Sequence, residues 1–258
     1  MATAQAKVRV AEEHSGQLVR VTLDDPPGNV LDIAMIDALR AVVADLTDAD
    51  AVKAVVFEGA GEHFSYGASI PEHRAGEVET FLPRFHALFR ELLELARPTC
   101  AIVRGRCLGG GLELASFCNR IFASPDAELG LPEIKLGVFA PLGALLLPER
   151  VGRAHAEELC LSGRIVKASE ARTLGLVDVV GEAPGVMARS WLENEIFPKS
   201  AVSLRFATRA LRSSMRAWFL PALEAVERLY LDQLMAHEDP REGVAAFLEK
   251  RPPHWKNR

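Results

Sequence analysis

Two acidic residues beside glycine-rich turns could act together as an acid and a base. Glu113 lies just after the run Gly109-Gly110-Gly111, about one helical turn beyond Gly110 and on the same helical face. Glu133 follows Leu131-Pro132, among apolar neighbours that could raise the pKa of its carboxyl group. A neutral carboxyl group can donate a proton while an ionised one deprotonates water. Each residue also has a simpler interpretation, Glu113 as a partner of the helix dipole and Glu133 as a surface acid.

Backbone N–H groups at two glycine turns could supply a site for negative charge. The turn at 105–111 joins a predicted strand to a predicted helix, so free N–H groups and the positive end of the helix dipole converge there. It has neither the G-x-G-x-x-G pattern of a dinucleotide site nor the Lys-Ser/Thr pair of a phosphate loop. At the second turn, Gly67 permits a sharp bend that could leave the Ala68 N–H unpaired. Two such turns could form an oxyanion hole, although a glycine run can also serve only to pack a helix against a sheet.

Strands and helices alternate over the first two-thirds of the chain. Hydrophobic spacing predicts strands over 17–23, 51–57 and 99–103. One helix begins after Asp32, which is well placed to cap it, and another runs over 77–95. Alternation of this kind predicts an α/β core of parallel strands with right-handed crossovers.

The remainder of the chain, from about Arg153, is predicted to be almost wholly helical. It carries an apolar stripe of the kind that usually faces a core or a subunit interface. No low-complexity linker separates the two parts, and we expect a core over 1–200 and a helical region over 201–258. The stripe consists of Leu220, Leu223, Val226, Leu229 and Leu234 and continues over 242–249.

Composition excludes several classes of protein. The 258 residues are 49% hydrophobic and 25% charged, as in an ordinary globular protein. The net charge of −5 provides no overall positive field for nucleic acid or for an anionic membrane, so we expect neither as a partner. The longest apolar stretch, 137–147, is too short to span a bilayer and is interrupted by Pro141.

Targeting and metal-binding signals are not found in the sequence. Residues 1–10 resemble neither a secretory signal nor a transit peptide, which predicts a cytoplasmic protein. No histidine pair has the spacing of zinc ligands and no Cys-x-x-Cys pair occurs, so we expect no metal site and reduced, mostly buried thiols. The four cysteines are Cys100, Cys107, Cys118 and Cys160.

Three sequence blocks resemble the signature blocks of one known family. They are Phe64-x-x-Gly67-Ala68-x-Ile70, Gly109-Gly110-Gly111-Leu112-Glu113-Leu114-Ala115 and Leu131-Pro132-Glu133-Ile134-x-Leu136-Gly137. On these blocks the chain is similar to the enoyl-CoA hydratase/isomerase, or crotonase, superfamily. The resemblance continues at 147–152, 175–178 and 247–251, and so covers nearly the whole chain.

The resemblance implies a fold, a substrate class and a set of catalytic roles. The fold is an α/β crotonase-type ββα spiral core with a C-terminal helical trimerisation region, assembled as a homotrimer or homohexamer. The substrate is a thioester of coenzyme A, so coenzyme A is part of the substrate and no further cofactor is needed. The N–H groups of Ala68 and Gly110 hold the thioester oxygen. Glu113 orients water and Glu133 donates the proton, and the presence of both acids favours water addition over a double-bond shift.

Several positions depart from the common hydratase pattern and should border the acyl pocket. Ser69, which lacks the second glycine of a nucleophile elbow, replaces the usual aspartate. Tyr66 replaces a small residue, and 138–143 replaces a proline- and glycine-rich loop. The combination of Phe-Ser-Tyr-Gly-Ala-Ser-Ile-Pro-Glu-His at 64–73 with Leu-Gly-Val-Phe-Ala-Pro at 136–141 resembles the cyclohexa-1,5-diene-1-carbonyl-CoA hydratases of anaerobic aromatic degradation. Rigid bulk at these positions would suit a planar ring. The implied substrate-binding residues are Ser65, Tyr66, Gly67, Ser69, Ile70, Phe139, Leu142 and, near the coenzyme phosphate, Lys256.

Two other functions stay open from the sequence. One is a straight-chain enoyl-CoA hydratase or isomerase of fatty-acid β-oxidation, which would share the fold and differ in substrate. The other is a non-catalytic crotonase-like protein that binds RNA. The net charge of −5 and the two retained acids both argue against RNA binding.

Overall fold

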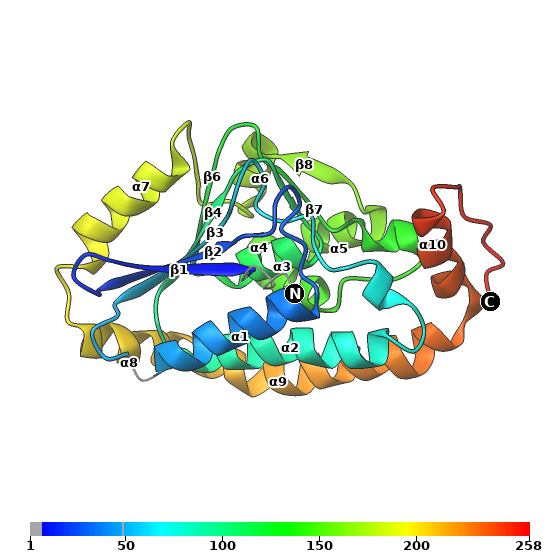
Figure 1. The fold of residues 1–258 in the computed structure, drawn as a ribbon, viewed down its shortest axis with the longest axis horizontal. Helices are drawn as coiled ribbons and strands as arrows, with labels where there is room; N and C mark the ends of the chain where they lie inside the picture. The colour runs from blue at the N-terminus through cyan, green and yellow to red at the C-terminus, as the bar shows by residue number, and fades with distance from the viewer. Residues whose placement is uncertain (1–6, 48) are drawn as a thin grey trace, which may run out of the picture.

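The computed structural model describes residues 7–47 and 49–258 and contains two β-sheets (Figure 1). The larger sheet contains β1 (Val8–Glu13), β2 (Leu18–Leu23), β3 (Ala54–Gly59), β4 (Thr99–Val103), β6 (Arg120–Ala123) and β9 (Val179–Val180), in that order. Strand β1 pairs antiparallel with β2, and every later neighbour pairs in parallel. The smaller sheet contains β5 (Arg106–Leu108), β7 (Glu128–Gly130) and β8 (Ile165–Lys167).

Helices cover the larger sheet and make up most of the C-terminal part. Figure 1 shows α1, α2 and α9 running together beneath the strands, with α10 and the C-terminus at one end. The α-helices are α1 (Ile33–Thr47), α2 (Val78–Glu94), α3 (Gly110–Phe117), α4 (Pro141–Val151), α5 (Arg153–Ser162), α6 (Ala168–Leu174), α7 (Pro184–Trp191), α8 (Ala201–Leu211), α9 (Ser213–Arg228) and α10 (Glu238–Leu248). Shorter helical turns are η1 (Pro71–His73), η2 (Pro132–Leu136), η3 (Leu192–Ile196), η4 (Leu229–Gln233) and η5 (Leu234–Ala236).

The central strands β2, β3 and β4 of the larger sheet are buried on both faces, whereas β1 at its edge is mostly exposed. Alternate residues of a strand point to opposite sides and so reach two different cores. On β3, Val55 and Phe57 belong to the main core, which includes α1 and α2. Ala54 and Val56 belong to a second core, which Ala188 of α7 helps to close. Burial on both faces is typical of parallel sheets and explains the continuous apolar sequence of this strand.

The local signals of the N-terminal part predict its elements closely. The cap at Asp32 is confirmed, since its Oδ1 accepts a hydrogen bond of 2.8 Å from the Met35 N–H at the start of α1. The predicted strands over 17–23 and 99–103 and the helix over 77–95 are confirmed within one residue at each end. The predicted strand over 51–57 begins three residues later, at Ala54.

The prediction of an almost wholly helical chain after Arg153 is wrong, because β8 joins the smaller sheet and β9 ends the larger one. Strands β1, β5, β6 and β7 were not predicted either. Most of these strands have only two to four residues, too few to display a period-two pattern. Their pairing is decided by distant parts of the chain, as where β7 lies between β5 and β8.

The C-terminal stripe is only partly the buried face that its spacing predicts. Leu223 is buried, but Leu229 is 44% exposed and the neighbouring Tyr230 is buried instead. The change of face coincides with the π-helical turn η4, which directly follows α9. A π-helical turn inserts an extra residue per turn and so rotates the residues that follow it. The boundary between 1–200 and 201–258 stays a prediction, although α8 does begin at Ala201.

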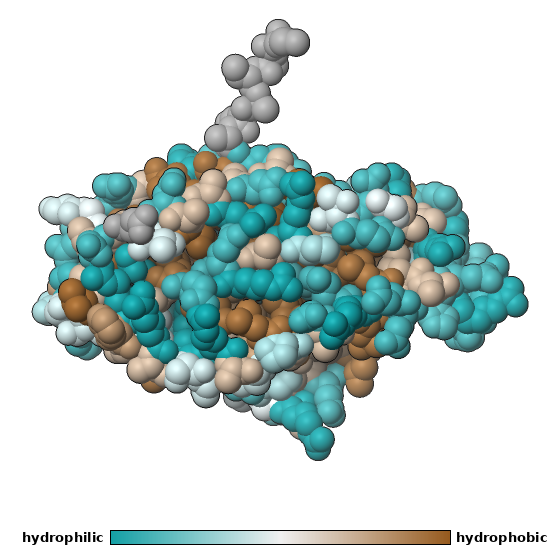
Figure 2. All heavy atoms as spheres, turned by 90° about the horizontal axis from the view of Figure 1, so that it is seen from below, coloured by the Kyte–Doolittle hydropathy of each residue, from teal (hydrophilic) through white to brown (hydrophobic). Residues whose placement is uncertain are grey.

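The face of the molecule drawn in Figure 2 is mostly hydrophilic with scattered apolar patches. Figure 2 shows the side on which α2 and α9 lie, where hydrophobic side chains appear between hydrophilic ones. Three exposed apolar residues, Val202, Phe206 and Leu211, belong to α8. Across residues 7–47 and 49–258, none of the helices combines the length and apolar character needed to cross a membrane.

All four cysteines are free thiols, and only Cys160 is not fully buried, as predicted.

Candidate active site

The two glycine turns place the N–H groups of Ala68 and Gly110 close together. A Cβ atom added to Gly110 would lie 3.3 Å from the Ala68 nitrogen. Neither nitrogen donates a hydrogen bond within the described part of the chain. Gly67 makes the approach possible, since its φ of +99° disfavours other residues and a Cβ there would lie 2.7 Å from the Leu108 oxygen. The arrangement offers two free donors to one oxygen atom, as an oxyanion hole requires.

Ser65 holds the two turns in register. Its carbonyl oxygen accepts a hydrogen bond of 3.0 Å from the Leu108 N–H. Its hydroxyl donates to the Asn29 carbonyl at 2.8 Å and accepts from the Gly67 N–H at 3.0 Å. The side chain is fully buried, so Ser65 supports the turn in this structure. Its predicted contact with substrate stays a prediction.

Glu113 lies buried in the first turn of α3 and is held by the first turn of α4. The Gly143 N–H donates to Glu113 Oε1 at 2.7 Å, and the Leu142 N–H is a second donor. Burial nevertheless raises the pKa of Glu113 to about 7, because these two hydrogen bonds offset only part of the cost of an ionised group in apolar surroundings. Glu113 is therefore more than a surface partner of the helix dipole.

Glu133 lies in η2, and its carboxyl group packs against the backbone of Gly109. A Cβ on Gly109 would lie 2.6 Å from Glu133 Oε1, and the φ of +50° at Gly109 also favours glycine. Glu133 Oε2 is buried, and no hydrogen-bond partner for it exists among the described residues. Burial raises the pKa of Glu133 to about 8, with the charge of Glu113 as a second cause. The surface-acid interpretation is wrong for this carboxyl group.

The two carboxyl groups interact, and so they titrate as a pair. Loss of one proton opposes loss of the second, because two neighbouring buried negative charges repel each other. The N–H donors at Glu113 favour its ionised form, whereas Glu133 Oε2 has no donor among the described residues, so the remaining proton is held mainly by Glu133. One site therefore holds a proton donor and a proton acceptor, next to two free N–H groups.

A cavity of about 450 Å³ is lined by sequence neighbours of these groups, although the groups themselves do not line it. Its wall contains Leu108 and Pro132, the neighbours of Gly109 and Glu133, together with the predicted binding residues Tyr66 and Ile70. Three cations line the mostly apolar wall of this cavity, and none of them was predicted from the sequence: Arg106, Lys135 and Arg251.

The other six predicted binding residues do not line this cavity, and the polar contacts of two of them lie elsewhere. Lys256 has its ammonium group 2.7 Å from Glu238 Oε2 and its backbone N–H on Asp239. Ser69 is nearly buried, and its carbonyl oxygen contacts His73 Nδ1 at 2.8 Å. The structure thus brings neither side chain to the cavity, and their contacts with substrate stay predictions.

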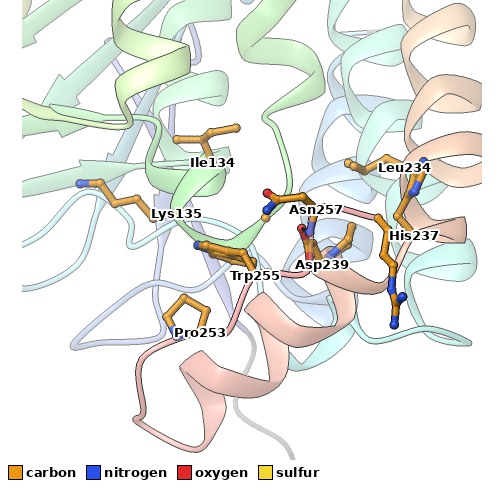
Figure 3. Close-up of a pocket in the computed structure, with 11 residues that line it drawn as sticks. Ile134, Lys135, Leu234, His237, Asp239, Pro253, Trp255 and Asn257 are labelled. Carbon is orange, nitrogen blue, oxygen red and sulfur yellow. Dashed lines mark hydrogen bonds between the residues drawn. The ribbon is translucent and has the colours of Figure 1, made fainter.

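A larger cavity, of about 680 Å³, lies beside the C-terminal tail (Figure 3). Ile134 and Lys135 of η2 form one side, and Trp255 and Asn257 of the tail lie opposite, near Asp239. None of the site residues predicted from the sequence lines it. Size alone therefore does not identify the reaction site, which is defined by the two carboxyl groups and the free N–H donors.

Aromatic side chains close the site on the side of the C-terminal helices. Phe139 is half-buried and its ring centroid lies 5.3 Å from that of Tyr230 in η4, while Leu142 is fully buried. Tyr230 was missed by the sequence analysis, which placed Leu229 in the apolar stripe instead. Its spacing from Leu223 and Val226, seven and four residues, follows the helical period and could have identified it.

Residues 7–47 and 49–258 contain no group of three His, Cys, Asp or Glu side chains that could hold a metal ion. The expectation that the reaction needs no metal and no separate cofactor stays a prediction.

Comparison with known proteins identifies relatives along the whole chain. The family model for enoyl-CoA hydratase/isomerase matches residues 13–258. The cyclohexa-1,5-dienecarbonyl-CoA hydratase of Thauera aromatica is 45% identical over 258 residues, which is 100% of both chains. A probable enoyl-CoA hydratase of Bacillus subtilis is 34% identical, over 92% of this chain and 94% of its own. The crystal structure of an enoyl-CoA hydratase from Mycobacterium avium subsp. paratuberculosis superposes with a TM-score of 0.85 and 27% identity, covering 98% of this chain and 99% of that one.

Proposed function

The chain belongs to the enoyl-CoA hydratase/isomerase family and is a hydratase, which is a lyase, and we propose that it adds water reversibly to cyclohexa-1,5-diene-1-carbonyl-CoA. The observation that carries the proposed reaction is the buried pair Glu113 and Glu133 beside the free N–H groups of Ala68 and Gly110. The relative from Thauera aromatica, whose name specifies the cyclic diene, supports the choice of acyl group.

The thioester oxygen accepts hydrogen bonds from the Ala68 and Gly110 N–H groups. Electron density moves onto this oxygen when a nucleophile attacks the β-carbon, so the two donors stabilise the enolate more than the starting thioester. Removing one donor of this type typically costs about 2.7–4 kcal/mol of transition-state stabilisation. The glycine turns thus contribute to catalysis through backbone groups alone.

The two glutamates supply the proton transfers. Ionised Glu113 takes a proton from water as the oxygen bonds to the β-carbon, and the electron pair of the double bond moves toward the thioester oxygen. Neutral Glu133 then returns a proton to carbon, which collapses the enolate. The sum of these steps adds one water molecule, and exchange of a proton between the carboxyl groups and solvent restores the starting state.

A ring diene changes where the proton is delivered. The second double bond extends the enolate to a dienolate, so the far end of the conjugated system also becomes basic. Protonation there leaves a double bond conjugated with the thioester and gives a 6-hydroxycyclohexene thioester. The rigid surfaces of Tyr66, Phe139 and Tyr230 suit a flat ring better than a long flexible chain.

The coenzyme A portion would occupy the cavity that Tyr66 and Ile70 line. Its mostly apolar wall fits the pantetheine arm, and Arg106, Lys135 and Arg251 provide positive charge for the phosphates. Lys135 forms no ion pair with any described residue, whereas Arg251 is bound to Glu242 and Glu249. Lys135 is therefore the cation most available to a phosphate group.

The wider setting is part of the same proposal. We place the reaction in the anaerobic degradation of aromatic compounds, in the cytoplasm, and expect a homotrimer or homohexamer. Val202 and Phe206, two exposed apolar residues four positions apart on one face of α8, support self-association, because exposed apolar surface often marks an interface.

Turnover against a small set of thioesters tests the function. The set contains the cyclic diene, crotonyl-CoA and a longer straight-chain enoyl-CoA, each followed by loss of conjugated absorbance and by identification of the product. We expect hydration of the cyclic diene with the highest kcat/KM. Absence of hydration with every thioester would overturn the assignment.

A further inference from the structure

The hydroxyl group of Tyr230 is buried without a partner. The side chain is 1% exposed, and no described residue offers its Oη a hydrogen bond. An unpaired buried hydroxyl typically costs about 1–3 kcal/mol of stability, and phenylalanine would avoid that cost at the same position. A polar atom kept in such a place indicates a partner that arrives with the substrate.

The position of Tyr230 in the fold points to the reaction site. It lies in the π-helical turn η4, and π-helical turns occur often at functional sites. Its ring contacts that of Phe139, which precedes the first turn of α4 where Glu113 is held. The C-terminal helices therefore contribute one aromatic side chain that packs against Phe139.

Both catalytic carboxyl groups act on the Tyr230 hydroxyl. Burial raises the pKa of Tyr230, and the charges of Glu133 and Glu113 raise it further, in that order. The hydroxyl group therefore stays neutral, so it can donate a hydrogen bond but is a poor proton donor. Glu133 Oε2 is likewise buried without a hydrogen-bond partner among the described residues.

We propose that Tyr230 is a further catalytic residue, whose hydroxyl donates a hydrogen bond to the oxygen of the attacking water molecule. The inference rests on the proposed hydratase reaction. A water molecule can accept this bond while donating its own protons to the carboxyl groups, so three groups fix the oxygen before it attacks.

The same contact serves the reverse reaction. The water oxygen becomes the hydroxyl oxygen of the product, and the Tyr230 hydrogen bond remains on it. When the hydroxyl group leaves, this bond stabilises the negative charge that develops on the oxygen. Tyr230 keeps its proton throughout, so the proton balance between the two glutamates is unchanged.

Tyr230→Phe tests the inference, because it removes the hydroxyl group and retains the ring against Phe139. We expect kcat to fall about 10–100-fold for both hydration and dehydration, as is typical when one donor to a reacting oxygen is lost. KM should change by less than about threefold, since the bond forms to the reacting oxygen and not to the thioester. The folded protein should be at least as stable as the wild type, because an unpaired polar group is removed.

Thr208→Val is the matched control. Thr208 is also buried, but its hydroxyl donates to the Leu204 carbonyl at 2.8 Å within α8. Its loss should lower stability and leave kcat unchanged, the opposite pattern to Tyr230→Phe. The pH profile of Tyr230→Phe should keep the wild-type shape at a lower plateau, since a neutral donor does not titrate in this range.

The outcomes separate this inference from the proposed function. A kcat of Tyr230→Phe within twofold of wild type, or a lost alkaline limb in its pH profile, would overturn the hydrogen-bond role. Both variants are assayed with the cyclic diene and with crotonyl-CoA. If the wild type hydrates only crotonyl-CoA, the ring substrate is wrong, and the fall in kcat on crotonyl-CoA still decides the role of Tyr230.

Discussion

The Gly143 N–H donates a 2.7 Å hydrogen bond to Glu113 Oε1 and so joins the first turn of α4 to that of α3. The positive end of the α4 dipole stabilises the ionised carboxylate, while burial favours its neutral form. The effect of burial is the larger of the two, and the hydrogen bonds offset part of it, so the pKa of Glu113 is raised to about 7. A base with this pKa is half ionised at neutral pH and still strong enough to deprotonate bound water.

Replacing either glutamate by glutamine should abolish most of the activity. Glu113→Gln and Glu133→Gln should each lower kcat by at least about 10²-fold, because an amide cannot carry the transferred proton. Steady-state assays and circular dichroism would check activity and folding together. Glu182→Gln, which removes an exposed acid, is the control for charge alone. A glutamine variant with a near-normal rate would remove that glutamate from the mechanism.

Activity should depend on pH in a bell-shaped manner. The reaction needs ionised Glu113 and neutral Glu133, whose pKa values are about 7 and about 8. The rate should therefore fall as the pH drops below the lower value and again as it rises above the higher one. A profile of kcat/KM from pH 5 to 10 would measure both limbs. A rate that stays level through pH 9.5 would contradict the requirement for a protonated Glu133.

Protein stability should respond to the same two groups. Both pKa values are raised above the usual 4.5, so the folded state binds more protons than the unfolded state between about pH 4.5 and 8. Their contribution is favourable at low pH and is lost as the pH rises through the folded-state pKa values. Relative to the wild type, the double variant Glu113→Gln, Glu133→Gln should become more stable, by several kcal/mol, as the pH rises from 5 to 8.5, because it has no buried carboxyl group to ionise. Urea unfolding at both pH values would detect the change, and a constant difference would contradict it.

Lys135 should affect binding of coenzyme A and not the chemical step. Its ammonium group lines the proposed entry cavity and has no ion-pair partner among the described residues. Lys135→Ala should raise KM about 2–5-fold with kcat unchanged, since an exposed ion pair is worth about 0.2–1 kcal/mol. Lys199→Ala, an exposed lysine of the segment before α8, is the control. If Lys256→Ala raises KM and Lys135→Ala does not, the phosphates lie at the residue that the family resemblance implies.

The sequence predicts those features that depend on neighbouring residues. Asp32 caps α1 by accepting a hydrogen bond from the N–H of Met35, three residues later. Gly67 and Gly109 indicate turns, and both have the positive φ that favours glycine. The two acids were identified by type and spacing. The burial of Glu113 and Glu133 was not predicted, because the N–H of Gly143 and the backbone of Gly109 approach their carboxyl groups only in the folded chain.

Features that depend on long-range packing were missed. The three residues of β8 pair with β7, and nothing in so short a segment specifies that partner. The prediction that Leu229 belongs to the apolar stripe assumed a continuous α-helix. The π-helical turn η4 interrupts that helix, so Tyr230 is buried and Leu229 is exposed. The cations of the entry cavity come from segments far apart in sequence, Arg106 from β5 and Arg251 from beyond α10. Such convergence is a property of the fold.

The central claim is tested most directly by kcat/KM for cyclohexa-1,5-diene-1-carbonyl-CoA and for crotonyl-CoA, measured side by side with the wild-type protein. Discrimination between substrates is the ratio of these two constants. The rigid aromatic pair Phe139 and Tyr230 predicts a ratio of at least about ten in favour of the ring diene, with a 6-hydroxycyclohexene thioester as the product. A clear preference for crotonyl-CoA would contradict the ring substrate and identify a straight-chain hydratase.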